Sequence, residues 1–326
     1  MTGSPGAMKR AGISGATNRR GLLARRRSPI RQRITEQSNP ISVDLDRKST
    51  RAILEIINRE DRAVAPAVRK VIPQIGRAAE FAIRAIGHGG RLVYLGAGTS
   101  GRLGVLDAAE CIPTFGTDSV VAVMAGAPDS MFRPTEASED DPRLAVRDLR
   151  QIRFGRSDVL VGISASGRTP YVLGGLRHAR RLGAKTVVLT SNPEAPAIPL
   201  ADVAIVPVVG PEVIAGSTRM KAGTAQKLVL NMLSTATMVR LGRVFSNLMI
   251  NMQLNNEKLL ARGQDILVQV TGASPETATR ALAASDRRLP VALLMLMRGL
   301  SNTEAVDLLG RERGIPKMFR RTQARG

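Results

Sequence analysis

Three loops of this chain carry residue types suited to binding an anion. The longest, Gly210–Lys227, reads GPEVIAGSTRMKAGTAQK and comes just before a long run of apolar residues at helical spacing. Its small residues let the backbone approach a ligand closely. Hydrogen-bonding and positively charged side chains follow them, namely Ser217, Thr218, Arg219 and Lys221. A loop of this composition at the start of a helix is suited to hold an anion.

The second loop, Ser164–Pro170, reads SASGRTP and lies between an apolar run and a helix that we expect to open at Pro170. The hydroxyls of Ser164, Ser166 and Thr169, with free N–H groups around Gly167, can surround a phosphate. The alternative is an ordinary serine turn at a helix start. Such a turn needs one hydroxyl only, so three hydroxyls and a glycine favour a ligand site.

The first loop, Gly96–Gly101, reads GAGTSG and matches the dinucleotide pattern G-x-G-x-x-G. A dinucleotide site also needs an acidic residue at the end of the next strand, and here that strand ends in Met124-Ala125-Gly126. Thr99 and Ser100 add hydroxyls that a dinucleotide turn does not need. With no Walker lysine pattern, the three loops favour a phosphorylated small molecule over a dinucleotide or ATP.

Short apolar runs between helical patterns must position these loops. The runs have few alternating polar residues, which predicts parallel strands covered on both faces. They lie at 91–95, 119–124, 159–163, 186–189 and 203–206, and helical patterns at 103–111, 139–150 and 171–182 separate most of them. This rhythm predicts an α/β fold with a doubly wound, parallel, five-stranded sheet over about 88–245. Ligands of such sheets bind at the carboxyl ends of the strands.

Helices are expected on both sides of that domain. Two helical patterns, over 44–58 and 62–87, precede it, and a long helix over 222–241 ends it. Beyond Leu241 the chain is predicted to be all-helical, with a helix start at Ser274-Pro275 and an end near Leu309. We therefore expect a basic tail over 1–34, a ligand-binding domain with its N-terminal helices over 35–262, and a small helical subdomain over 263–326.

Composition excludes several kinds of site. The 326 residues include one cysteine and two histidines, which rules out a disulfide framework, a multi-cysteine metal cage and a histidine-rich metal site. We therefore expect no metal and no cofactor. No segment approaches the ~20 apolar residues of a membrane span.

The N-terminal tail holds nine of the 21 net positive charges and no acidic residue. We expect it to be disordered. It lacks the aromatic residues that stack on bases, so we read it as a solvated extension, or as residues upstream of the true start, and we do not expect nucleic acid as a partner. Arg25–Arg27 follow its twin arginines where an export signal needs apolar residues, so we expect a cytoplasmic protein. An organelle transit peptide stays open as an alternative.

These loops resemble the sugar isomerase (SIS) family, in which an S-x-S-G-x-T loop grips the phosphate of phosphosugars. More closely, the chain resembles the N-acetylmuramic acid 6-phosphate etherase family, and parts of the match are shared with glucokinase regulatory protein. The resemblance spans about 35–262. The matching segments are Thr35-Glu36, Asn39-Pro40, Tyr94–Gly116, Gly162–Tyr171, Gly210–Leu233 and Asn255–Leu259.

The resemblance implies cleavage of the D-lactyl ether of N-acetylmuramic acid 6-phosphate, with N-acetylglucosamine 6-phosphate and D-lactate as products. That reaction needs a base for the C2 proton and an acid for the departing lactate. The family pattern places these carboxylates at Glu110 and Glu139, and we expect Glu110 to be the acid and Glu139 the base. The expected substrate-binding residues are Thr99, Ser100, Ser164, Ser166, Gly167, Thr169, Glu212, Ser217, Thr218, Arg219 and Lys221.

Other acidic residues lie near the two glutamates. They are Asp107, Glu136, Asp140 and Asp141, and from the residues alone any of them is as plausible a candidate as Glu139. The alternative is that they are solvated or cap helices. We expect Cys111 to be a buried apolar residue. Ten residues on one predicted helix separate Ser100 from Glu110, which is about 15 Å. A hexose phosphate is shorter, so we expect a homodimer whose active site combines residues of both subunits.

Two alternative functions remain at this point. A regulator of the glucokinase-regulator type would bind sugar phosphates without turnover, but that protein has two SIS domains and this chain has room for one. A phosphosugar isomerase would also need a base at C2. The presence of both Glu110 and Glu139 favours an etherase.

Overall fold

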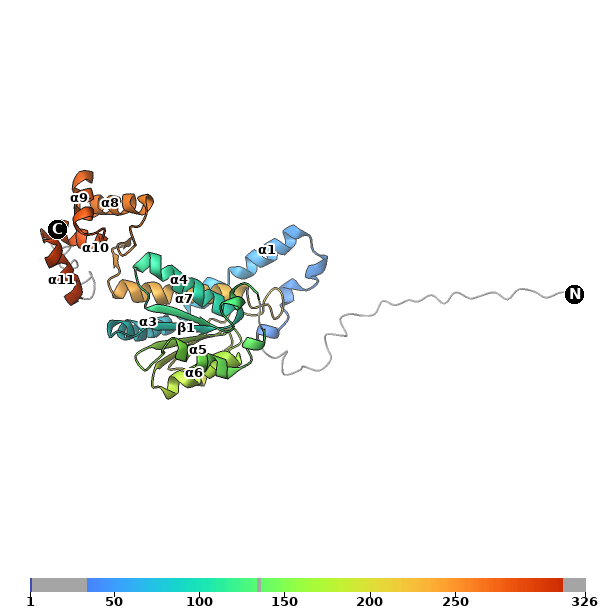
Figure 1. The fold of residues 1–326 in the computed structure, drawn as a ribbon. Helices are drawn as coiled ribbons and strands as arrows, with labels where there is room; N and C mark the ends of the chain where they lie inside the picture. The colour runs from blue at the N-terminus through green and yellow to red at the C-terminus, as the bar shows by residue number, and fades with distance from the viewer. Residues whose placement is uncertain (2–33, 134–135, 313–326) are drawn as a thin grey trace.

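Five parallel strands form the centre of the computed structural model, which describes residues 1, 34–133 and 136–312 (Figure 1). The strands are β1 (Leu92–Gly96), β2 (Val120–Met124), β3 (Val159–Ile163), β4 (Lys185–Leu189) and β5 (Val203–Ile205). Their order is β2-β1-β3-β4-β5, and every neighbouring pair is parallel. The predicted doubly wound sheet is confirmed, and its strand ends agree with the prediction to within one residue.

Helices cover both faces of the sheet because its strands are apolar on both sides. Successive residues of a strand point to opposite faces, so Leu92 and Tyr94 join one hydrophobic cluster, and Val93 and Leu95 join another. The first cluster includes residues of α2 (Val64–Arg69), α3 (Ile72–Gly87), α4 (Gly98–Phe115) and α7 (Lys221–Arg240). The second includes residues of α5 (Pro142–Gln151) and α6 (Pro170–Arg181). Figure 1 shows α5 and α6 on the side of the sheet opposite α4 and α7.

The N-terminal helices differ from the prediction. Three 3-10 turns, η2 (Ile34–Glu36), η3 (Pro40–Ser42) and η4 (Leu45–Arg47), precede α1 (Thr50–Asp61). The single helix predicted over 62–87 is wrong, because α2 and α3 divide it. Pro73 gives the reason: it has no N–H to donate, and its ring clashes with the carbonyl of Arg69, at which α2 ends.

The C-terminal part is helical except for one hairpin that the prediction missed. Antiparallel strands β6 (Val244–Phe245) and β7 (Leu248–Met249) follow α7. Ser274 caps α9 by accepting a hydrogen bond from the N–H of Thr277, as predicted. The helices that follow the hairpin are α8 (Glu257–Thr271), α9 (Pro275–Ala284), α10 (Leu289–Arg298) and α11 (Asn302–Glu312).

These C-terminal helices form a group apart from the sheet (Figure 1). They have a hydrophobic cluster of their own, whose first residue along the chain is Ile250. The boundary expected at residue 262 lies inside α8, so a C-terminal unit defined by packing begins earlier.

In the ranges that the structure describes, no helix is both long and apolar enough to span a membrane. The expectations for the basic tail fall on residues 2–33, which lie outside the described residues.

Candidate active site

The strand order reverses at β1, and this reversal locates the candidate site. β2 lies on one side of β1, and β3 on the other. Ligands of open α/β sheets bind at the carboxyl ends of the strands at such a point. Gly96 at the end of β1 pairs with Ile163 at the end of β3, so the loops that follow the two strands leave the sheet side by side. These are the first and second loops predicted from the sequence.

The second loop brings its three hydroxyls together. Ser164 Oγ lies 2.8 Å from Thr169 Oγ1 and 3.5 Å from Ser166 Oγ, and it accepts a hydrogen bond of 3.0 Å from the N–H of Gly167. Gly167 has a φ of 64°, and a Cβ there would collide with Ala195. Only glycine therefore lets the loop close this tightly. The structure thus forms the compact hydroxyl cluster expected of a phosphate loop.

A polar segment after β4 holds this loop in place, and the sequence reasoning missed it. Thr190 Oγ1 donates to the carbonyl of Ala165 at 3.0 Å, and Asn192 Nδ2 donates to the carbonyl of Ser166 at 3.1 Å. The N–H of Ser191 also donates to Ala165. The signal that could have revealed this segment is a run of three polar residues directly after a buried strand.

The first loop opens α4 and packs against α7. Ala97, at the cap position of α4, offers no side-chain hydrogen bond to the helix. A Cβ placed on Gly223 of α7 would lie 3.6 Å from Thr99 Cγ2, so the two helices are in close contact here. Ser100 is 9% exposed, and its Oγ donates to Gln226 Oε1 at 3.0 Å. The first loop is therefore joined to the helix that follows the third loop.

The third loop is held by two residues that we expected to bind substrate. Glu212 is buried, and its carboxylate accepts hydrogen bonds from the N–H groups of Lys221 and Ala222, at 3.0 and 2.9 Å. Glu212 thus caps α7. Burial raises the pKa of Glu212 above its ordinary value, although both N–H groups and the Lys221 charge oppose the shift. Ser217 and Thr218 are half-buried and Arg219 is exposed.

The side chain of Lys221 is also paired with another residue of the chain. Its ammonium is buried and donates to Glu60 Oε2 at 2.6 Å. Asn39 Nδ2 donates to the same oxygen at 2.6 Å and to the carbonyl of Pro211 at 3.0 Å. Burial raises the pKa of Glu60, but the hydrogen bonds from Lys221 and Asn39 and the Lys221 charge lower it below its ordinary value. Sequence reasoning gave Glu60 no role, because it is one polar residue among many on α1.

Glu139 lies beside the first turn of α4. Its Oε1 is 3.0 Å from the place that a Cβ on Gly98 would occupy. Its carbonyl accepts a hydrogen bond of 3.0 Å from the N–H of Tyr171, at the start of α6. Glu139 therefore stands between the helices that follow β1 and β3, within the candidate site.

Glu110 lies away from this group. It is exposed on α4, which runs without interruption from Gly98 to Phe115. Twelve residues separate Gly98 from Glu110, a rise of about 18 Å along the helix. The structure thus brings Glu139 to the hydroxyl loops of its own chain and leaves Glu110 outside them.

Asp107 corrects one of our expectations. It is neither solvated nor a helix cap, but is buried and accepts hydrogen bonds from Tyr94 at 2.8 Å, Asn231 at 2.9 Å and Ser234 at 3.1 Å. Burial raises the pKa of Asp107, although the three hydrogen bonds oppose the shift.

Cys111, Asp140 and Asp141 agree with expectation. Cys111 is buried, which together with the Asp107 charge raises the pKa of its thiol to about 12. Asp141 caps α5 by accepting a hydrogen bond from the N–H of Arg143, and Asp140 is exposed. The side chain of Glu136 lies outside the described part of the chain.

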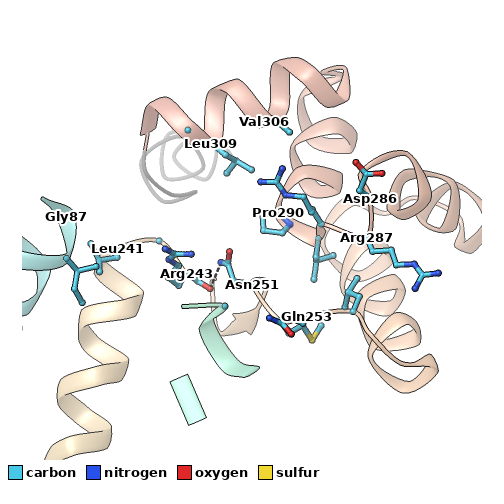
Figure 2. A pocket seen from close by; sticks show the side chains of 18 of the residues that line it. Gly87, Leu241, Arg243, Asn251, Gln253, Asp286, Arg287, Pro290, Val306 and Leu309 are labelled. Carbon is cyan, nitrogen blue, oxygen red and sulfur yellow. Dashed lines mark hydrogen bonds between the residues drawn. The ribbon is translucent and has the colours of Figure 1, made fainter. Parts of the chain in front are cut away.

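One cavity of the described structure is distinct from this site. It has a volume of about 1130 Å³ and lies between the ends of α3, α4 and α7 and the C-terminal helices (Figure 2). Gly87, Gly116 and Leu241 line it from the first group, and Pro290 and Val306 from the second. Those helix ends lie at the edge of the sheet opposite the three loops. Within residues 34–133 and 136–312, no cluster of three or more His, Cys, Asp or Glu side chains could hold a metal ion.

Two family models agree with the fold. The model of the glucokinase regulatory protein N-terminal SIS domain matches residues 74–180, and that of the SIS domain matches residues 150–236. A phosphoheptose isomerase structure from Neisseria gonorrhoeae is 20% identical, covers 57% of this chain and 96% of its own, and superposes with a TM-score of 0.46.

Curated relatives are closer in sequence. The N-acetylmuramic acid 6-phosphate etherase of Edwardsiella ictaluri is 51% identical over 214 residues, which are 65% of this chain and 71% of the relative. The etherase of Vibrio campbellii is 52% identical over 199 residues, 60% of this chain and 65% of the relative. The etherase of Clostridium botulinum strain Langeland is 47% identical over 213 residues, 65% of this chain and 70% of the relative.

Proposed function

The chain belongs to the N-acetylmuramic acid 6-phosphate etherase family, and we propose that it hydrolyses the D-lactyl ether of N-acetylmuramic acid 6-phosphate. The products are N-acetylglucosamine 6-phosphate and D-lactate, which places the enzyme in amino-sugar catabolism and cell-wall recycling. The observation that carries this proposal is the hydroxyl cluster of Ser164, Ser166 and Thr169 at the strand reversal, in a chain about half identical to etherases.

The hydroxyl cluster is assigned to the substrate phosphate. A phosphate only accepts hydrogen bonds when it is fully ionised, and hydroxyl and backbone N–H donors at a helix start suit it. The Ser164 cluster stands at the start of α6, where Thr169 is the cap residue and provides no side-chain cap to the helix. Its hydroxyl lies 2.8 Å from Ser164 Oγ, and only one of the two gives its hydrogen to the other, so one hydrogen of the pair remains for a ligand. Arg219, exposed on the third loop, is assigned to the lactyl carboxylate or the phosphate.

The two glutamates are assigned to proton transfer. In the open-chain sugar the C1 aldehyde acidifies the C2 proton, which Glu139 removes as general base. The electron pair forms the C2–C3 double bond, the bond from C3 to the lactyl oxygen breaks, and Glu110 protonates the departing oxygen. Water then adds at C3 and a proton returns to C2. The sum is one ether and one water converted to an alcohol and D-lactate, with no change in oxidation state.

The distance between the two glutamates supports a homodimer with shared sites. Glu139 lies at the first turn of α4, whereas Glu110 lies about 18 Å further along the same helix. Leu106, one turn before Glu110 on α4, is 49% exposed. A second subunit packed on this face would cover this apolar side chain and bring its own Glu110 to the hydroxyl loops. We also propose a cytoplasmic location, on the charge pattern of the N-terminal tail alone.

The test is release of D-lactate from N-acetylmuramic acid 6-phosphate by the purified protein in ¹⁸O-water. Elimination followed by water addition puts the label on C3 of the sugar and leaves lactate unlabelled. Label in lactate would exclude the elimination. In the same assay, Glu139→Gln should bind the substrate and fail to release lactate, because the amide cannot take the C2 proton.

A sugar-phosphate sensor is the second candidate, since residues 74–180 match the glucokinase regulatory protein domain model. The lactate assay separates the two candidates. A sensor would bind N-acetylglucosamine 6-phosphate and release no lactate, and an isomerase would form a ketose phosphate instead.

A further inference from the structure

Gln226 of α7 has an unusual environment. It is 1% exposed, its Oε1 accepts a hydrogen bond from Ser100 Oγ, and its Nε2 has no hydrogen-bond partner. Only two other buried side-chain atoms in the described ranges lack a partner, Gln74 Oε1 and Ser191 Oγ. A buried donor without a partner lowers the stability of the fold, and protein interiors contain few of them. A methionine would fill a similar volume without this cost, so packing does not explain the amide.

The position of Gln226 indicates what the amide is for. Ser100 lies in the first turn of α4, and the Glu139 carboxylate stands against Gly98 of the same turn. Thr99 of the same turn packs against Gly223, one turn before Gln226 on α7. Gln226 therefore lies directly behind the turn that faces Glu139, at the contact between the first and third loops.

The hydrogen bond from Ser100 has a chemical consequence. A serine hydroxyl has one hydrogen to donate and two lone pairs to accept with. Because Ser100 gives its hydrogen to Gln226, only its lone pairs remain for a ligand. An ionised phosphate has no hydrogen to offer, so Ser100 cannot pair with it. A sugar hydroxyl or an amide N–H can donate to Ser100.

We propose that Gln226 is a positioning residue that makes Ser100 an acceptor for the sugar part of the substrate. Its free Nε2 is a donor for an oxygen that arrives with the bound sugar, directly or through one water molecule. The identity of the sugar rests on the proposed function. With this role for Gln226, the site has a phosphate part at the Ser164 cluster and a sugar part at the first turn of α4.

The test compares two ligands on the Gln226→Met variant by calorimetry, inorganic phosphate and N-acetylglucosamine 6-phosphate. We expect the dissociation constant for inorganic phosphate to stay within about twofold, and that for the sugar phosphate to rise about tenfold. The melting temperature of the free variant should equal or exceed that of the wild type, because the unpartnered buried donor is gone. A purely structural role predicts a lower melting temperature and equal effects on both ligands.

Two further variants sharpen the result. Ser100→Ala should cause the same selective loss, and the double variant Gln226→Met/Ser100→Ala should be no worse than the single ones, because the two residues act as one unit. Gln74→Met is the matched control. It makes the same substitution at the other glutamine with an unpartnered amide atom, on α3, and should leave both affinities unchanged.

An unchanged affinity for the sugar phosphate in Gln226→Met overturns the proposal, as do additive losses in the double variant. These outcomes are distinct from failure of the proposed function. A wild-type protein that binds N-acetylglucosamine 6-phosphate and releases no lactate contradicts the etherase activity alone.

Discussion

Three carboxylates near the sheet have lost most of their contact with water, and each has a different set of donors. Glu212 accepts two backbone N–H groups, Asp107 accepts only neutral side-chain donors, and Glu60 faces the Lys221 ammonium. The charged donor lowers the pKa of Glu60, whereas burial dominates at Asp107 and Glu212 and raises theirs. The pKa values of these three carboxyl groups thus shift in opposite directions, according to whether a charged donor offsets the effect of burial.

The raised pKa of Asp107 predicts how the unfolding free energy depends on pH. Its pKa is higher in the folded chain than the ordinary value of 3.8, so its contribution to stability is complete below that value and is lost as the pH rises through the folded pKa. Asn at this position does not titrate. As the pH rises from the ordinary value of 3.8 through the raised pKa of the folded chain, the unfolding free energy of Asp107→Asn should therefore rise relative to the wild type. Urea unfolding across this range measures the difference, with the exposed Asp118→Asn as control. A difference that does not vary with pH would contradict the prediction.

At the scale of elements, the N-terminal segment supports the third loop. Asn39 before η3 donates to Pro211, the N–H of Gly216 donates to the carbonyl of Thr35, and Glu60 in the last turn of α1 pairs with Lys221 at the start of α7. These contacts join residues more than 150 positions apart in the chain. The loop that carries Arg219 is therefore anchored by a segment outside the sheet.

The Glu60–Lys221 pair should contribute strongly to stability. Glu60→Gln leaves a buried ammonium without its counter-charge, and we expect a loss of about 3 kcal/mol in unfolding free energy. The double variant Glu60→Gln/Lys221→Met removes both charges and should recover most of the loss. Glu55→Gln is the matched control on α1, because it breaks the exposed Arg51–Glu55 pair and should cost less than about 0.5 kcal/mol. Urea unfolding measures all three. If Glu60→Gln lowers the unfolding free energy as little as Glu55→Gln does, the Glu60–Lys221 pair does not stabilise the fold.

At the scale of the whole molecule, one long helix separates the functional groups. α4 starts at the hydroxyl loops and ends at Phe115, near the cavity of Figure 2. A chain that uses both ends of this helix for one hexose phosphate needs a second copy of itself. The exposed face with Leu106 and Glu110 is the surface that we assign to that contact.

Subunit mixing tests this arrangement. Glu110→Ala and Ser164→Ala should each be inactive alone, and an equimolar mixture of the two should recover about a quarter of the wild-type activity, because about half of its dimers are mixed and each mixed dimer has one intact site of two. Ser164 and Glu139 belong to the same subunit's half of the site, so mixing Ser164→Ala with Glu139→Gln should recover nothing. Lactate release after mixing and re-equilibration is the measurement. No recovery in the first mixture would place Glu110 in the site of its own chain or outside the reaction.

Much of this architecture could be predicted from local sequence. The strands are runs of Val, Leu and Ile that are buried on both faces, and the loops after β1 and β3 carry glycines and hydroxyls directly at the strand ends. Such features depend on neighbouring residues, so periodicity and composition reveal them. The separation of Glu110 from Ser100 also follows from helix geometry alone, once both are assigned to one helix.

Other features depended on the tertiary structure, because their partners are distant in the chain. Buried Asp107 accepts hydrogen bonds from Asn231 and Ser234 of α7. The ammonium of Lys221 pairs with Glu60, and the hydroxyl of Ser100 donates to Gln226. Nothing within a few residues of these side chains specifies their partners. The sequence by itself thus determined which loops carry glycines and hydroxyls at the strand ends, and the packing of α1, α4 and α7 decided which polar side chains already have partners inside the chain.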